Sequence, residues 1–116
     1  MTGFIYHITS RSSWSSAQPS GVYSADSLSS QGFIHCSKAD QVLRVANSFY
    51  AGQPGLVILV IDPSLLKPAL RWEPGTDKAD ELFPHIFGPL NLDAVINVLE
   101  FPPGPDGKYS LPIKLE

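Results

Sequence analysis

The chain has 116 residues, of which 43% are hydrophobic and 16% are charged, and its formal net charge is −3. This composition is typical of one compact domain, spanning residues 1–116, and it argues against an intrinsically disordered segment. The Lys and Arg residues form no cluster, which argues against a surface for duplex nucleic acid. A pocket for a mononucleotide needs only a few hydrogen-bond donors, so the net charge of −3 is compatible with one.

Cys36 is the only cysteine, so an internal disulfide and a thiolate zinc site are excluded. The first residues show no basic region followed by an apolar core, as a signal peptide would. The longest apolar run, residues 56–61, is too short to span a bilayer. We therefore expect a cytoplasmic protein without a membrane span, present as a monomer or a small homo-oligomer.

The first third of the sequence predicts a buried strand followed by a serine-rich segment. Residues 4–8 are apolar and β-prone, and they carry His7. Thr9 or the serine after it can cap a short helix over residues 11–18. Serine is frequent over residues 10–37, where the hydroxyls serve either as caps and turns or as donors around a ligand.

A six-residue stretch, Gly-Phe-Ile-His-Cys-Ser, is the centre around which we place a site. Gly32 provides a turn, residues 33–36 predict a short buried strand, and Ser37 is a preferred helix N-cap. Apolar residues at helical spacing predict the main helix over residues 38–51. His35 therefore precedes a helix N-terminus, whose backbone N–H groups favour a phosphate or a carboxylate.

The second half of the chain predicts strands separated by turns. Residues 56–61 form a continuous apolar run, as in a strand that is covered on both faces. Residues 68–73 alternate in polarity, which predicts another strand. Further strands are expected at 22–23, 94–99 and 109–115, a helical turn at 26–30, an aromatic segment at 83–89 and a loop at 74–81. The expected fold is α+β: a small split or curved mixed β-sheet of about five to seven short strands with one main helix.

The three histidines, His7, His35 and His85, each lie in an apolar or aromatic segment, where a buried imidazole needs a hydrogen-bonding partner. They either converge on one pocket, bind a metal with an open coordination position, or serve the structure separately. No His-x-x-x-His spacing supports a metal, and we assign no metal ligand. Adjacent strand residues point to opposite faces, so His35 is not a base for Cys36, which we interpret as a small buried apolar residue.

Glu73 is the carboxylate candidate. It either forms a surface ion pair with Arg71 or stabilises a cationic transition state electrostatically. Arg44 and Gln41 share the polar face of the main helix, where solvated side chains are the rule, although they could reach a ligand at the helix start. Glu81, in the predicted loop, is expected to be solvated.

These residues carry a resemblance to a bacterial family of uncharacterised proteins, domain-of-unknown-function family 952. The resemblance covers nearly the whole chain, and Phe87 stands where a tyrosine is common in the family. The motifs that carry it are Ile5-Tyr6-His7-Ile8, Gly32-Phe33-Ile34-His35-Cys36-Ser37, Leu70-Arg71-Trp72-Glu73 and Phe83-Pro84-His85-Ile86-Phe87-Gly88-Pro89.

The resemblance implies an ADP-ribosyltransferase-like fold, which binds NAD in a cleft between two small sheets. By that analogy, His7 would contact the nicotinamide ribose or a phosphate, and His85 or Glu73 would lie near the catalytic end. The chain lacks the Glu-x-Glu or Gln-x-Glu pair of protein-modifying transferases. The catalytic candidates are therefore His7, His35, Glu73 and His85, and the ligand-binding candidates are His7, Thr9, His35, Ser37 and Arg44.

The expected function is a histidine-lined pocket that binds NAD or a related phosphorylated nucleotide. The reaction would be transfer or hydrolysis of a glycosyl or phosphoryl group, through an oxocarbenium-like state in the glycosyl case. Two alternatives stay open at this point. One is a non-enzymatic ligand-binding or accessory module, and the other is a metal-dependent hydrolase that uses the three histidines.

Overall fold

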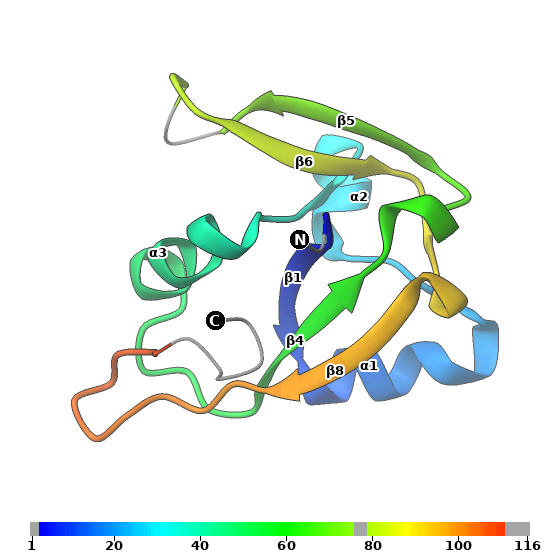
Figure 1. The fold of residues 1–116 in the computed structure, drawn as a ribbon. Helices are drawn as coiled ribbons and strands as arrows, with labels where there is room; N and C mark the ends of the chain where they lie inside the picture. The colour runs from blue at the N-terminus through cyan, green and yellow to red at the C-terminus, as the bar shows by residue number, and fades with distance from the viewer. Residues whose placement is uncertain (1–2, 76–78, 111–116) are drawn as a thin grey trace.

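The structure, a computed structural model, describes residues 3–75 and 79–110. These residues form an α+β fold with small antiparallel sheets and few helices (Figure 1). The strands are β1 (Ile5–Ser10), β2 (Val22–Tyr23), β3 (Ile34–His35), β4 (Leu56–Ile61), β5 (Ala69–Pro74), β6 (Leu82–Phe87), β7 (Leu90–Asn91) and β8 (Val95–Glu100). The helices are α1 (Arg11–Ala17), α2 (Asp26–Gln31) and α3 (Ala39–Phe49), with 3₁₀ turns at Gln18–Ser20, Pro63–Leu65 and Leu92–Ala94.

Three sheets organise the described residues. A central sheet has the order β1-β4-β8, a second sheet has the order β3-β6-β5, and β2 pairs with β7. All of these pairs are antiparallel. The α+β class is confirmed, whereas the expected mixed sheet of five to seven strands is corrected to antiparallel sheets with eight described strands. Of the two-residue strands, β2 lies at the expected 22–23 and β3 within the expected 33–36, whereas β7 follows only from its pairing with β2.

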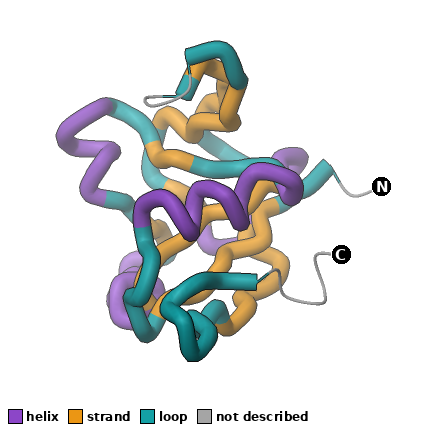
Figure 2. The backbone as a smooth tube through the Cα atoms, turned by 90° about the vertical axis from the view of Figure 1, so that its left-hand side faces the viewer, coloured by secondary structure: helices purple, strands orange, loops and turns teal. Residues whose placement is uncertain are grey.

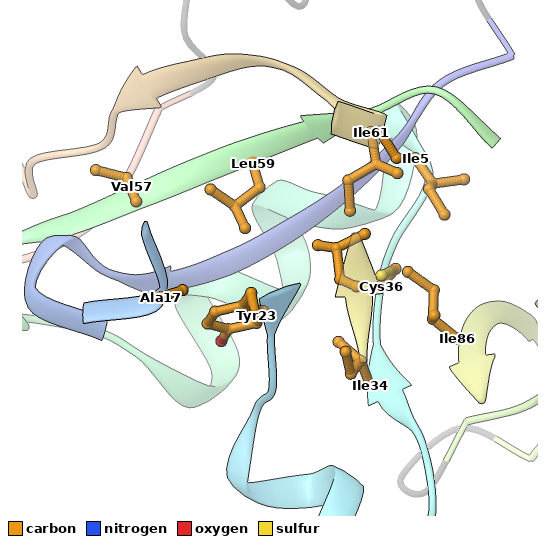
Figure 3. Close-up of a cluster of buried hydrophobic side chains, with 11 residues drawn as sticks. Ile5, Ala17, Tyr23, Ile34, Cys36, Val57, Leu59, Ile61 and Ile86 are labelled. Carbon is orange, nitrogen blue, oxygen red and sulfur yellow. The ribbon is translucent and has the colours of Figure 1, made fainter. Parts of the chain in front are cut away.

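The central sheet separates two apolar clusters. All six residues of β4 are buried, as the apolar run predicts. Val57, Leu59 and Ile61 face the cluster that also holds Cys36 and Tyr23 (Figure 3). The alternate residues of β4 face a second cluster that includes the α3 residues Val42 and Ala46 together with Phe101 and Tyr109. Each fully buried Val, Leu or Ile side chain contributes about 1.5–3 kcal/mol, so β4 anchors both layers.

The main helix is predicted well, since α3 occupies residues 39–49 of the expected 38–51. Figure 2 shows it lying across the strands. None of the helices within residues 3–75 and 79–110 is long and apolar enough to cross a bilayer. The expected strand at 109–115 falls mostly outside the described residues, and Tyr109 itself is a buried residue outside any strand.

Ser37 does not cap α3 as expected. Its backbone pairs with that of Tyr6, with both N–H to carbonyl distances at 2.8 Å, and this bridge ties β3 to β1. The helix therefore starts one residue later, with Lys38 at the N-cap position. The Lys38 backbone N–H donates to Gln41 Oε1 over 2.9 Å, so a side chain from the first turn of the helix closes its start.

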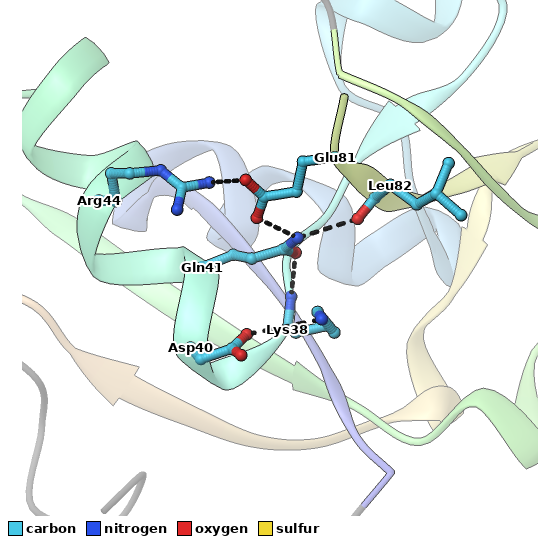
Figure 4. Close-up of polar contacts among 6 residues, drawn as sticks. All are labelled: Lys38, Asp40, Gln41, Arg44, Glu81 and Leu82. Carbon is cyan, nitrogen blue, oxygen red and sulfur yellow. Dashed lines mark hydrogen bonds and ion pairs between the residues drawn. The ribbon is translucent and has the colours of Figure 1, made fainter. Parts of the chain in front are cut away.

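Gln41 and Glu81 join α3 to the start of β6 (Figure 4). Gln41 is 1% exposed, which corrects the expectation of a solvated side chain. Its Nε2 donates to Glu81 Oε2 over 2.7 Å and to the Leu82 carbonyl over 2.9 Å. Arg44 donates to Glu81 Oε1 over 2.7 Å. Glu81 is thus a structural partner of the helix and not a solvated loop residue.

Candidate functional site

A cavity of about 540 Å³ opens between the central sheet and the β3-β6-β5 sheet, and His7, His35 and His85 all line it. Its volume lies in the range of small-molecule sites. Strand β1, the start of α2, the segment after β3 and the end of α3 also contribute to its wall. The other lining residues are Ile8, Thr9, Ser10, Ser13, Tyr23, Ser24, Ala25, Asp26, Ser27, Cys36, Ser37, Val45, Phe49, Tyr50, Gln53, Leu56, Gly75 and Phe83.

His7 is held by the protein at both ring nitrogens. Its Nδ1 lies 2.5 Å from the His35 carbonyl oxygen, and its Nε2 lies 2.9 Å from the Tyr23 hydroxyl. The Tyr23 hydroxyl is also 2.9 Å from Thr9 Oγ1. Burial lowers the pKa of His7 to about 4, so the ring is neutral at pH 7. Because a carbonyl only accepts, the proton of the neutral ring sits on Nδ1, which leaves Nε2 as the acceptor nitrogen beside the Tyr23 hydroxyl.

His85 has a different environment. Its Nδ1 lies 3.0 Å from Glu73 Oε1, and its ring stacks on Phe33 with centroids 4.1 Å apart and an interplanar angle of 16°. The side chain is 3% exposed, and Nε2 has no hydrogen-bond partner among the described residues. With a proton on Nδ1 donated to the carboxylate, Nε2 is the nitrogen that can bind a ligand or accept a proton.

Glu73 does not pair with Arg71. Strand register places Arg71 opposite His85, while Glu73 reaches the same histidine from two residues along β5. The Arg71 guanidinium lies 5.3 Å from the centroid of the Phe87 ring, a cation–π contact. Glu73 does not line the cavity itself, so it acts on the site through His85.

His35 links these two histidines. Its carbonyl binds His7, its Nε2 lies 2.5 Å from Gln31 Oε1, and its ring centroid lies 5.4 Å from that of His85. Burial and the neighbouring His85 lower the pKa of His35. His35 therefore offers a neutral ring at the cavity wall.

The remaining predicted residues divide between the cavity and the surface. Thr9 and Ser37 line the cavity, and Ser37 Oγ has no hydrogen-bond partner in the described part of the chain. Arg44 lies outside the lining, in its ion pair with Glu81. Cys36 is buried in the apolar cluster, where burial raises its pKa, as a structural thiol should.

Tyr23 is the site residue that sequence reasoning missed. A tyrosine in a two-residue strand carries no signal that separates it from a core residue. Only the packing of β2 against β1 shows that its hydroxyl meets His7 and Thr9. Likewise, Phe49 fits the apolar stripe of the helix by its spacing, yet it is 54% exposed and lines the cavity.

The arrangement supports acid–base chemistry better than metal chemistry. Within residues 3–75 and 79–110, no group of three His, Cys, Asp or Glu side chains could hold a metal ion. Both nitrogens of His7 are already bound by the protein, which removes one ligand from a three-histidine site. The Glu73–His85 pair has instead the geometry of a base that a carboxylate orients.

Comparisons with known proteins agree on a family and on a fold. A family model described as "Protein of unknown function (DUF952)" matches residues 8–98. A crystal structure of protein CC0527 from Caulobacter crescentus is 31% identical, with 97% of each chain covered and a TM-score of 0.85. The solution NMR structure of CC0527 is 30% identical over 92% of this chain and 91% of that one, with a TM-score of 0.78. No curated protein matches.

Proposed function

The chain belongs to the DUF952 family of proteins of unknown function, and we propose that it is an enzyme that binds NAD or a related phosphorylated nucleotide in the histidine-lined cavity. The proposed reaction is hydrolysis or transfer at an N-glycosidic bond. His85 is the general base, Glu73 is the residue that positions it, and His7, His35, Thr9 and Ser37 surround the ligand. This proposal keeps the ADP-ribosyltransferase-like interpretation of the fold, which a cavity between two small sheets supports.

The observation that carries the proposal is the pairing of Glu73 with His85 beside a cavity of about 540 Å³. His7 has both ring nitrogens bound by the protein and offers none to a ligand. His85 has one nitrogen bound to a carboxylate, and the other has no partner within residues 3–75 and 79–110. A base in that state takes a proton from water or a hydroxyl, and the carboxylate stabilises the imidazolium that forms.

In the proposed hydrolysis, a water oxygen attacks the anomeric carbon of the ribose as the bond from that carbon to nitrogen breaks. The leaving base takes the bonding electrons, so that a pyridinium becomes a neutral pyridine. His85 Nε2 takes the proton that the water loses. An acceptor hydroxyl in place of water gives transfer by the same steps, and the carboxylate of Glu73 balances the charge gained on His85.

The test measures release of nicotinamide from NAD by chromatography, with the wild-type chain and His85→Asn. The Asn side chain keeps a donor for Glu73 but has no basic nitrogen, so turnover should fall by about 100- to 10,000-fold. Asp40→Asn is the matched control, because the Asp40 side chain is 78% exposed on α3. That variant should keep the wild-type rate.

Binding is followed in parallel by the thermal midpoint, which rises when a ligand binds only the folded state. If NAD or ADP-ribose raises the thermal midpoint but neither the wild type nor a variant forms product, the protein is a ligand-binding module and not an enzyme. No rise at millimolar NAD or ADP-ribose would remove the nucleotide from the proposal altogether.

A further inference from the structure

We propose that the cavity encloses the nucleoside part of its ligand, with its ribose hydroxyls and base, and that the phosphates stay outside. This inference rests on the proposed function, whose ligand is a phosphorylated nucleotide. It names the part of that nucleotide that the wall of the cavity recognises. Three features of the wall carry it: its charge, its hydroxyl groups and its aromatic rim.

The described part of the wall has no Lys or Arg side chain for a phosphate. Among the described lining residues, Asp26 is the only Asp, Glu, Lys or Arg side chain, and it cannot supply a positive charge. Arg44, the basic residue that sequence suggested for the ligand, lies outside the lining and is bound to Glu81. A phosphate that entered the cavity would lose its hydration without gaining a counter-charge, which is costly.

His7 and His35 do not supply a positive charge in place of Lys or Arg. Both nitrogens of His7 are occupied, and the pKa values of His7 and His35 are lowered by burial, so these rings are neutral at pH 7. Neutral imidazoles donate to or accept from hydroxyl groups, whereas a phosphate site normally uses Arg, Lys or a charged histidine.

Hydroxyl groups are the dominant polar component of the wall. Serine and threonine contribute a set of side chains to it: Thr9, Ser10, Ser13, Ser24, Ser27 and Ser37. Some of them are used by the protein, since Ser10 accepts from the Ser13 backbone N–H and Ser27 donates to the Phe33 carbonyl. Ser37 is 5% exposed, and its hydroxyl has no partner among the described residues. It is therefore available to a sugar hydroxyl, for which it can both donate and accept.

Aromatic side chains lie where a base would need them. Phe49 and Tyr50 line the cavity at the end of α3, and Phe83 lines it from β6. Phe49 is 54% exposed and lines the cavity, so its ring is accessible to a ligand there. A flat base gains stacking energy on such a ring without any charge. Hydroxyl groups and aromatic rings in the wall of one cavity match a nucleoside.

Calorimetric titration of the whole chain compares nicotinamide riboside, nicotinamide mononucleotide, inorganic phosphate and pyrophosphate. The riboside should bind within about threefold of the mononucleotide, because a phosphate held by a charge-assisted bond would add about tenfold or more. Phosphate and pyrophosphate should not compete with the riboside. Between about 0.05 and 0.5 M salt, the riboside and mononucleotide affinities should also change to the same extent, since the phosphate forms no ion pair with the protein.

Ser37→Ala separates this inference from the proposed function. Removal of the hydroxyl should weaken riboside binding by about 2- to 10-fold, because one neutral hydrogen bond is lost. Ser30→Ala is the matched control, since Ser30 is exposed on α2 and does not line the cavity. Tight binding of the mononucleotide with no binding of the riboside would overturn the inference and leave the proposed function standing. Absence of binding for NAD, the mononucleotide and the riboside would overturn both.

Discussion

The cavity holds two histidines of opposite character, His7 on β1 and His85 on β6. His7 has both ring nitrogens bound by the protein, through the His35 carbonyl and the Tyr23 hydroxyl. His85 has one ring nitrogen bound to Glu73, and its other nitrogen has no partner in the part of the chain that the structure describes. The same side chain is thus a structural connector at one wall and a candidate base at the other. What decides between these roles is the number of nitrogens that the fold leaves for a ligand.

The largest effect is expected from Glu73→Gln, which breaks the pair at the His85 wall. Without the carboxylate, His85 loses the group that orients it and balances its charge, so kcat should fall by about 100-fold or more. KM and the thermal midpoint should stay near their wild-type values, because Glu73 lies outside the cavity lining. Steady-state kinetics on NAD give both constants. A loss confined to KM would contradict the positioning role.

The burial of His7 should make the free energy of unfolding depend on pH. In the unfolded chain His7 has its ordinary pKa of 6.5, whereas burial lowers it to about 4 in the folded chain. Between these values the unfolded state binds more protons, so the free energy of unfolding rises with pH. Stability is complete above the unfolded pKa and is lost as the pH falls toward the folded one, by up to about 3 kcal/mol. His35 adds to the same trend, since burial also lowers its pKa.

Urea unfolding at several pH values checks this, with His7→Asn beside the wild type. The Asn side chain keeps a donor for the His35 carbonyl but does not titrate. The free energy of unfolding of the variant should therefore be flatter across the window between the two pKa values. Parallel curves for the two proteins would mean that His7 is not a buried neutral ring.

Tyr23→Phe tests the contact between the Tyr23 hydroxyl and His7 Nε2. The substitution keeps the ring and removes the hydroxyl between His7 Nε2 and Thr9 Oγ1. A buried acceptor is then left without a partner, which should lower the free energy of unfolding by about 1–3 kcal/mol. Denaturant unfolding measures the loss. A change indistinguishable from zero would show that water or a rearranged side chain satisfies His7 equally well.

The smallest effect is expected away from both walls. Glu81→Gln weakens the ion pair with Arg44, whose side chain is 46% exposed, and keeps an acceptor for Gln41. Exposed pairs contribute less than about 1 kcal/mol, so stability should change little and turnover should not change at all. A loss of turnover as large as that of Glu73→Gln would mean that the junction of α3 and β6, and not the His85 pair, controls the site.

The sequence predicts the long elements well and the site in part. Local periodicity is sufficient for α3 and β4, because both are fixed by their own apolar patterns. It also places His7, His35 and His85 in apolar segments, where each needs a partner. The identity of those partners depends on strand register, since Glu73 meets His85 only through the alignment of β5 with β6.

Local sequence patterns do not predict which side chains make long-range contacts. Gln41 is polar and falls on the polar face of its helix, yet contacts 40 and 41 residues away bury it. Ser37 has the composition of a helix cap, but the bridge to Tyr6 uses its backbone instead. Tyr23 carries no signal of its role until β2 packs against β1. In each case tertiary contacts override a local preference.

The central claim is that one cavity joins His85, as a base with a vacant nitrogen, to His7, as a neutral connector. Histidine-resolved NMR during titration with NAD tests it most directly, because the chain has only three histidines. The account predicts that the His35 and His85 signals shift with one common dissociation constant, while His7 keeps its proton on Nδ1 throughout. Signals of His35 and His85 that do not move at saturating NAD, or a His7 ring that is charged at pH 7, would contradict it.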